Sequence, residues 1–335
     1  MEPEKVRAPN IRDVARVAGV SYQTVSRVLN DSEAIRPATR ERVLQAIDEL
    51  GYRPNQAARA LVTSRSRTIG VLSSQSSQYG PATSIAAIEA AAREAGYRLS
   101  ITNTASSEYA SIKAGVDYLM SQAVEALVVI APQVRVFEAL QDLSVSVPIV
   151  TLESTGRDPR RSLSVDQVAG ARLATRHLLD LGHRDILHLA GPQDWIEAEA
   201  RMQGYLEALA DADARTRAPI LGDWTASFGY YAGLELLRVR DFTAVFVAND
   251  QMALGLLHAA RELGLQVPDD LSVVGFDDIP EAAHFAPPLT TVRQNFVEIG
   301  RRAVSILLAE LRGETSTDHQ MVLPELILRE STGPV

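Results

Sequence analysis

The sequence predicts an α/β protein in which a small all-α helix-turn-helix domain precedes two doubly wound parallel-sheet lobes. A length of 335 residues exceeds that of one ordinary domain. Near the N-terminus, two short helical segments flank a glycine-containing turn, which is the helix-turn-helix arrangement. Beyond residue 67, short apolar runs alternate with amphipathic helices, and this alternation predicts parallel sheets covered on both faces.

Charge divides the chain in the same way. Residues 1–67 hold 12 basic and 8 acidic side chains, whereas the remainder holds 21 basic and 34 acidic ones. Phosphates repel an acidic body, so only the N-terminal part is expected to face DNA. We predict a helix-turn-helix domain over residues 1–53, a linker over 54–67 and a two-lobed core over 68–330.

The first two helices have recognisable ends. Asn10 can cap a helix over Ile11–Ala18, and Asp13 places a carboxylate at its third position. Gly19 suits the left-handed turn that follows. Ser21 can then cap a second helix, Tyr22–Leu29.

Apolar side chains predict how this domain packs. Ala15 is small where the two helices cross, and Val20, Val25 and Val28 fill the contact. A third helix is predicted over Pro37–Leu50, with proline in its first turn and Gly51 after its end. Its side chains expected in the core are Val43, Leu44, Ile47 and Leu50.

The runs Ile11–Ala15 and Ala18–Val28 closely resemble the DNA-binding domain of the LacI/GalR family of transcription regulators. The resemblance implies that Tyr22, Gln23 and Arg27 face outward to read bases, since glutamine pairs with adenine and arginine with guanine. Three further residues are expected to contact phosphates or cap the helix: Ser21, Thr24 and Asn30.

Residues 52–61 are similar to the family's hinge segment. The resemblance implies a hinge helix that forms on operator DNA, with Ala58 at the DNA and Leu61 wedged into the minor groove. The alternative is a simple linker with Leu61 on its surface.

In the acidic body, apolar runs predict strands, and amphipathic stretches between them predict helices. The expected strands are Thr68–Ser73, Arg98–Thr104, Ala126–Ile130, Pro148–Leu152, Asp185–Leu189, Ala244–Val247 and Leu271–Gly275, with another before Gly222. The expected helices include Ile85–Ala95, Ala169–Leu181, Tyr230–Leu237 and Met252–Leu263. The family's core resembles a periplasmic sugar-binding protein, with ligand in the cleft at the strand ends.

Four polar or aromatic residues follow predicted strands: Arg201, Trp224, Asn249 and Asp277. Tryptophan covers the apolar face of a pyranose, while the other three bind hydroxyls. Taken singly, Trp224 fits a core, Asn249 a helix cap, and Asp277 with Asp278 a solvated turn. By resemblance, the effector set also includes Ser74, Glu153, Gln294 and Phe296.

Several residues depart from the family's galactoside-binding pattern. Glu153 occupies a position where that pattern has Asp, and Ile130 one where it has Asn. Gln78 and Ser84 replace apolar residues, and Asn295 replaces an Asp. A galactoside is the first expectation, with another hexose or a disaccharide as alternatives. A purine corepressor stacked on Trp224 is a further alternative.

The resemblance implies a repressor of pseudo-palindromic operator DNA whose affinity falls when a sugar binds. The corepressor sense remains open. No leucine heptads follow residue 330, so a homodimer is expected.

Two other protein classes are alternatives to a transcription regulator. An enzyme is disfavoured because phosphate-loop, zinc-helix and serine-elbow motifs are missing from the sequence. A transport-type sugar-binding protein would carry an export signal and no helix-turn-helix. With zero Cys, no secretory signal and no spanning apolar run, a cytoplasmic protein with no membrane partner, cofactor or metal is expected.

Overall fold

The computed structural model describes residues 9–29, 34–53, 65–74, 77–104, 106–130, 133–141, 143, 145–153, 162–315 and 320–335. The chain divides into two units, Met1–Ser66 and Arg67–Val335. Each unit is described by itself.

The N-terminal unit holds α1 (Ile11–Ala18), α2 (Tyr22–Leu29) and α3 (Pro37–Leu50). At the start of α1, the Asn10 side chain accepts hydrogen bonds from the backbone N–H groups of Arg12 and Asp13. The Asp13 carboxylate in turn accepts one from the Asn10 N–H at 3.0 Å. This is the capping box that the sequence predicts. Gly19 ends α1 with a left-handed φ of 63°.

The core of this unit differs from the prediction at one position. Val14, Val25 and Val43 are fully buried, but Leu44 is 51% exposed and Ala46 takes a place in the core. Positions 43, 46, 47 and 50 follow the 3.6-residue helical period, and Leu44 falls beside that stripe. The expectation that Leu44 packs in the core was therefore wrong.

We expect Asn10→Ala to weaken α1 by about 1 kcal/mol, since the side-chain acceptor for two backbone N–H groups is lost. Hydrogen exchange of the α1 amides in the full chain should then be about five-fold faster. Asn10→Asp keeps the acceptor and should exchange as the natural chain does. Equal exchange in the alanine variant would mean that the cap does not stabilise α1.

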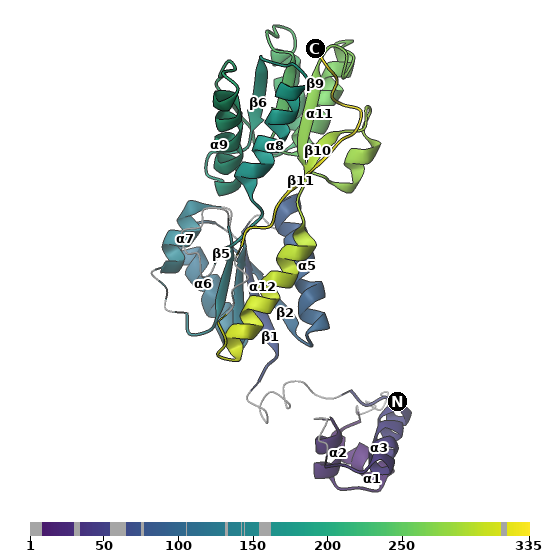
Figure 1. Ribbon diagram of the computed structural model, residues 1–335. Coiled ribbons are helices and arrows are strands. Elements are labelled where there is room, and N and C mark those ends of the chain that lie inside the picture. Colours follow the sequence, from purple (N-terminus) through teal and green to yellow (C-terminus); the bar gives the residue numbers. More distant parts are fainter. Residues whose placement is uncertain are drawn as a thin grey trace, which may run out of the picture. The chain divides into compact units, whose positions relative to one another are not determined.

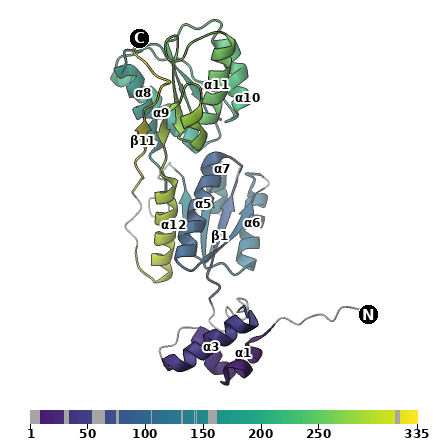
Figure 2. The same cartoon turned by 90° about the vertical axis from the view of Figure 1, so that its right-hand side faces the viewer.

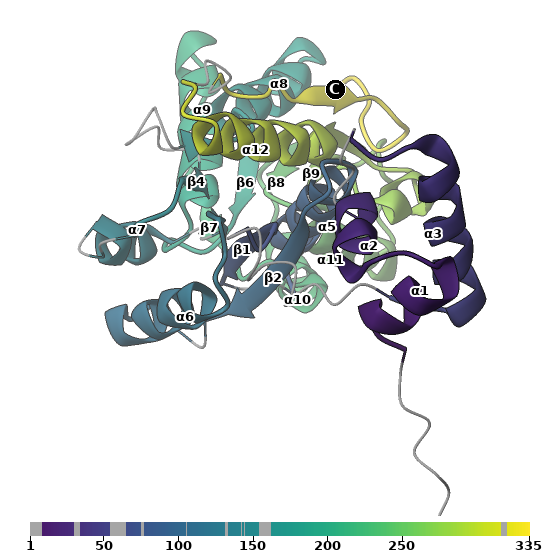
Figure 3. The ribbon, with the colours of Figure 1, turned by 90° about the horizontal axis from the view of Figure 1, so that it is seen from below.

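The first lobe of the core unit contains one parallel sheet of order β2-β1-β3-β4-β5. Its strands are β1 (Thr68–Ser73), β2 (Arg98–Asn103), β3 (Ala126–Ile130), β4 (Ile149–Leu152) and β5 (Ser162–Leu163). Its helices are α5 (Tyr79–Glu94), α6 (Tyr109–Ser121), α7 (Val134–Gln141) and α12 (Phe296–Leu311). Helices α5 and α12 cover one face, while α6 and α7 cover the other (Figure 3).

The second lobe contains a sheet of order β11-β10-β9-β8-β6-β7, in which β11 alone runs antiparallel to its neighbour. Its strands are β6 (Ile186–Ala190), β7 (Ile220–Leu221), β8 (Ala244–Val247), β9 (Ser272–Asp277), β10 (Thr290–Arg293) and β11 (Glu325–Ile327). Its helices are α8 (Gln167–Asp180), α9 (Ile196–Asp211), α10 (Ala226–Leu236), α11 (Asp250–Glu262) and the short 3₁₀ helix η1 (Pro280–His284). Helices α8 and α9 pack on one face, and α10 and α11 pack on the other (Figure 2).

Within the described residues, the chain passes between the lobes after β5, after β10 and before β11 (Figure 1). The first and last crossings are hydrogen-bonded to each other, because Val322 bridges Val165 and exchanges backbone hydrogen bonds with Ser164 and Asp166. The middle crossing carries Gln294. These crossings are the covalent links about which the lobes can turn.

The predicted α/β class and two-lobed architecture agree with the structure. The bounds of β1, β3 and β8 are those predicted, whereas α5 and α10 begin earlier than expected, at Tyr79 and Ala226. Of the helices that the structure describes, none is long and apolar enough to cross a membrane.

Candidate functional site

The exposed face of α2 is the first candidate surface. Tyr22 is 54% exposed, and Gln23 and Arg27, one helical turn apart, are exposed as well. Ser21 caps the helix, since its hydroxyl accepts a hydrogen bond from the Thr24 N–H at 3.1 Å. The three side chains expected to read bases therefore project from one short helix with a fixed start. Asn30, Ala58 and Leu61 lie outside the described residues.

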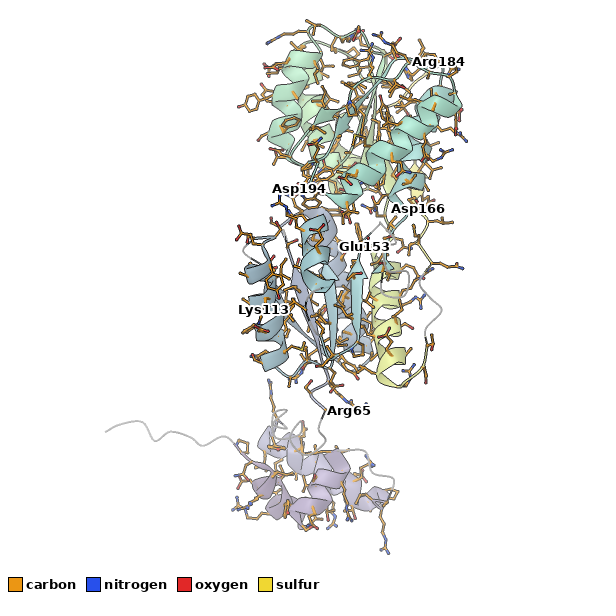
Figure 4. The ribbon with its side chains drawn as sticks, turned by 90° about the vertical axis from the view of Figure 1, so that its left-hand side faces the viewer. Arg65, Lys113, Glu153, Asp166, Arg184 and Asp194 are labelled. Carbon is orange, nitrogen blue, oxygen red and sulfur yellow. The ribbon has the colours of Figure 1, made fainter. Side chains whose placement is uncertain are left out.

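The second candidate is a cavity of about 760 Å³ in the core unit, counted to its open mouth. Its wall combines residues from both lobes and from the crossings between them. These residues are Gln78, Tyr79, Gly80, Pro81, Ser84, Ile130, Leu152, Glu153, Leu163, Ser164, Val165, Gln167, Trp195, Glu197, Arg201, Trp224, Asn249, Gln251, Asp277, Gln294, Phe296 and Ile299. In Figure 4, Glu153 lies at the end of the first lobe that faces the second, and Asp194 and Asp166 lie at the facing end of the second lobe.

A closed ring of four buried side chains stands in this wall. Arg201 Nε donates to Gln167 Oε1 at 2.8 Å, and Gln167 Nε2 donates to Gln294 Oε1 at 2.7 Å. Gln294 Nε2 donates to Asp277 Oδ1 at 2.7 Å, and Arg201 Nη2 lies 3.5 Å from that oxygen. Gln167 directly follows the first crossing as the first residue of α8, and Gln294 lies in the middle crossing, so the ring joins the cavity to two of the links between the lobes.

Arg201 is also held from its other sides. It lies in the second turn of α9, with 5% of its surface exposed, and its Nη1 donates to the carbonyl of Ala248. Its guanidinium carbon lies 3.9 Å from the centroid of the Phe276 ring. A planar cation between an aromatic face and fixed acceptors has little freedom to move. It therefore offers a rigid donor surface to the cavity.

Trp224, which follows β7, and Asn249, which follows β8, are joined by a hydrogen bond across the end of the intervening strand β6. Asn249 Nδ2 donates to the Trp224 carbonyl at 3.0 Å, while its Oδ1 caps α11 by accepting from the Met252 N–H. Asn249 is thus a helix cap and a cavity residue at once. Trp224 has a left-handed φ of 71°, a strained conformation often found at functional sites. Its ring packs so closely on Gly191 that a Cβ there would lie 2.1 Å from it.

Burial changes the ionisation of two acids in the wall. It raises the pKa of Asp277 to about 6, although Arg201 and the Gln294 hydrogen bond oppose the shift. It raises the pKa of Glu197 to about 7; the negative charge of Glu153 adds to this increase, whereas the positive charge of Arg201 opposes it. Among the described residues, no group of three or more His, Cys, Asp or Glu side chains could hold a metal ion. The wall offers fixed donors, acceptors and aromatic faces, which suit a polyhydroxylated ligand.

These raised pKa values predict a pH-dependent stability. A carboxyl group with a raised pKa in the folded state is protonated more readily there than in the unfolded chain. Its stabilising contribution is full at low pH and is lost as pH rises through about 6 for Asp277 and about 7 for Glu197. For Glu197 we expect the loss to be on the order of 2 kcal/mol.

Urea unfolding of the ligand-free chain at pH 5 and pH 8 measures this loss. Glu197→Gln should show a smaller decrease in unfolding free energy between the two pH values. Glu199→Gln, at an exposed position of the same helix, is the matched control and should behave like the natural chain. Parallel decreases in both variants would assign the pH dependence to other groups.

Of the remaining predicted effector residues, two line the cavity and one does not. Glu153 and Phe296 lie in the cavity wall, and Glu153 accepts a hydrogen bond from the Ser162 hydroxyl. Ser74 does not line the cavity, and its buried hydroxyl has no hydrogen-bond partner among the described residues. Its backbone N–H instead joins β1 to Ile130.

Several wall residues were not predicted from the sequence, among them Gln167, Trp195 and Glu197. Trp195 and Glu197 lie a few residues after the predicted strand Asp185–Leu189. Because ligands bind at the carboxyl ends of parallel strands, this position in the sequence could have identified both residues. Gln167 precedes the predicted helix Ala169–Leu181 by two residues, follows no recognised strand end and carries no comparable signal.

Comparisons with known proteins cover almost the whole chain. Residues 10–55 match the model of bacterial regulatory proteins of the lacI family, and residues 175–332 match that of a periplasmic binding protein-like domain. The chain is 36% identical over 322 residues to the lactose operon repressor of Escherichia coli (strain K12), covering 96% of this chain and 89% of that protein.

Two solved structures extend the likeness to three dimensions. A crystal structure of the lac repressor dimer bound to operator and the anti-inducer ONPF is 34% identical, with a TM-score of 0.88, and the match covers 98% of this chain and 100% of that one. A complex of the transcriptional regulator CelR with cellobiose is 33% identical, with a TM-score of 0.72, over 96% and 99% of the two chains.

Proposed function

Because the chain belongs to the lacI family of bacterial regulatory proteins, we propose that it is a transcriptional repressor whose operator affinity is lowered by a small saccharide. The observation that carries this proposal is the pairing, in one chain, of an exposed helix in a lacI-family DNA-binding unit with a polar cavity between two hinged lobes. Its place of action is the cytoplasm, where operator DNA lies.

The DNA-binding half rests on α2. Tyr22, Gln23 and Arg27 are proposed to contact base edges in the major groove, and Ser21 and Thr24 to contact phosphates. Asn30, Ala58 and Leu61 remain proposals from the family resemblance. Relatives in this family are regulators of transcription, which supports a role in regulation rather than in catalysis.

The effector half rests on the cavity wall. Arg201, Asn249 and Asp277 present hydroxyl-binding groups, Trp224 presents an aromatic face, and Glu153 closes the wall from the first lobe. Of the solved relatives named above, one holds the anti-inducer ONPF and the other holds cellobiose, a saccharide. A saccharide is therefore the proposed ligand class.

The proposed mechanism is a two-state switch. A saccharide that binds between the lobes favours one lobe arrangement, and the Arg201 ring transmits its contacts to two of the crossings. In a dimer, the lobe arrangement sets the separation of the two Arg67 positions from which the DNA-binding units extend. The effector shifts the equilibrium only by its differential affinity for the two states.

A second copy of this chain is the proposed partner, as in the lac repressor dimer. In the core unit, α10 and α11 expose apolar side chains, among them Tyr231 at 68% and Leu254 at 43%. Sedimentation should give about twice the 36.4 kDa chain mass. A two-fold dimer requires a pseudo-palindromic operator with half-sites about one helical turn apart.

Fluorescence anisotropy on labelled palindromic DNA tests the proposal. The operator is first selected from a random library with the full chain, and saccharides and purines are then added in turn. The proposal expects salt-dependent specific binding that one saccharide releases. Binding that tightens with a purine or a sugar would establish a corepressor instead. Failure to select any sequence would contradict the repressor role.

A further inference from the structure

Both tryptophans of the chain line the cavity, and the function proposed above uses only one of them. Trp195 stands just before α9 and Trp224 just before α10. Their ring centroids are 5.3 Å apart, and their planes meet at 67°. The two rings therefore form an aromatic corner in the wall.

The steep angle between the rings limits what one sugar can do there. A pyranose chair stacks on an aromatic ring through a face that lies parallel to it, and its two faces are nearly parallel to each other. Two aromatic planes at 67° cannot both stack on the same chair. One pyranose on Trp224 leaves the face of Trp195 for another ring.

A polar group accompanies Trp195, as Arg201 accompanies Trp224. Glu197 lines the cavity two residues after Trp195, and among the residues that the structure describes its buried Oε2 has no hydrogen-bond partner. A buried carboxylate oxygen without a hydrogen bond destabilises the protein, so a ligand hydroxyl that donates to it removes this penalty and favours binding. The Trp224 Nε1, a donor, is also buried, and no described residue accepts a hydrogen bond from it. The corner thus holds one free acceptor and one free donor.

Contacts with the first lobe fix the segment that carries Trp195. Gln133, which follows β3, forms an antiparallel bridge with Trp195. Its Nε2 also donates to Asp194 Oδ2 at 3.1 Å. Figure 4 labels Asp194 at the end of the second lobe that faces the first. The Trp195 face is therefore positioned by both lobes rather than by a loop alone.

We propose that Trp195 and Glu197 form a second ring-binding subsite beside that of Trp224 and Arg201, so that the effector is a two-ring saccharide. This inference rests on the proposed function, because it assumes that the cavity binds a saccharide. It assigns Trp195 the stacking contact and Glu197 a hydroxyl contact with the second ring.

Intrinsic tryptophan fluorescence tests the subsite directly, since both tryptophans of the chain lie in the cavity wall. The probes are lactose, cellobiose, maltose, melibiose and trehalose, together with glucose, galactose and their methyl glycosides. We expect one disaccharide to bind at least about ten-fold more tightly than any single-ring probe.

Two variants then locate the second ring. Trp195→Leu and the nearly isosteric Glu197→Gln should each weaken the disaccharide about ten-fold and change the affinity of a single-ring probe less than about three-fold. Glu199→Gln, exposed on the same helix, should leave both affinities unchanged. If Trp195→Leu fails to fold, Glu197→Gln still decides.

Two results overturn the inference in distinguishable ways. Single-ring probes that bind as tightly as every disaccharide, with both variants weakening all probes equally, would remove the second subsite and leave the repressor proposal intact. No response of either fluorescence or operator affinity to any probe would contradict the saccharide effector itself, and the subsite with it.

Discussion

Replacing Arg201 with alanine is expected to abolish the effector response while operator binding persists. The substitution opens the four-residue ring and removes the cation between Phe276 and the cavity. It also leaves the buried Asp277 with Gln294 as its one side-chain partner within the described part of the chain. Removing one member of a buried charged pair costs about 3–5 kcal/mol. We expect saccharide affinity to fall at least about 100-fold, with a lower melting temperature.

Anisotropy with the selected operator, with and without the saccharide, measures this effect. Arg201→Lys keeps the charge but loses the planar fork, so it should fold better and still respond poorly. Arg172→Ala is the matched control, because its ion pairs with Glu207 and Asp211 lie at the surface. An Arg201→Ala variant that releases operator at the usual saccharide concentration would remove Arg201 from the site.

Replacing Arg27 with alanine is expected to do the reverse. Its side chain is exposed on α2, one turn after Gln23, where a bidentate contact to guanine discriminates by about 1–3 kcal/mol. Operator affinity should fall about ten- to 100-fold for each half-site, while the saccharide affinity measured by tryptophan fluorescence stays the same.

Comparison with random DNA separates base reading from phosphate binding. If Arg27 reads a base, the alanine variant loses affinity for the operator and keeps most of its affinity for random DNA. Arg16→Ala, at an exposed position of α1 where Arg16 pairs with Asp13, is the control and should change operator binding little. Equal losses on operator and random DNA would make Arg27 a phosphate contact.

Much of the fold could be predicted from the sequence because its signals are local. The capping box at Asn10 and the turn at Gly19 depend on neighbouring residues only. The buried strands β1, β3 and β8 are apolar runs with clear ends. Two-residue strands such as β5, and the polar β10, carry no periodicity of their own and form only when the sheet is present.

The site was predictable where residues follow strands. Arg201 and Asn249 come after strand ends, and Asp277 is the last residue of β9; parallel topology brings these strand ends to one edge. Gln167 joins them only because the first crossing places it beside Gln294, 127 residues away. Trp195 needed its bridge to Gln133 of the other lobe. Contacts that depend on how the lobes meet leave no pattern in the sequence.

In the proposed mechanism the cavity and the DNA-binding surface share one equilibrium, so the binding of each ligand must affect that of the other. Saccharide affinity is measured by tryptophan fluorescence with and without saturating operator, and operator affinity by anisotropy with and without saturating saccharide. We predict that each ligand weakens the binding affinity of the other by the same factor, about five- to 150-fold. A saccharide affinity unchanged by operator would contradict it.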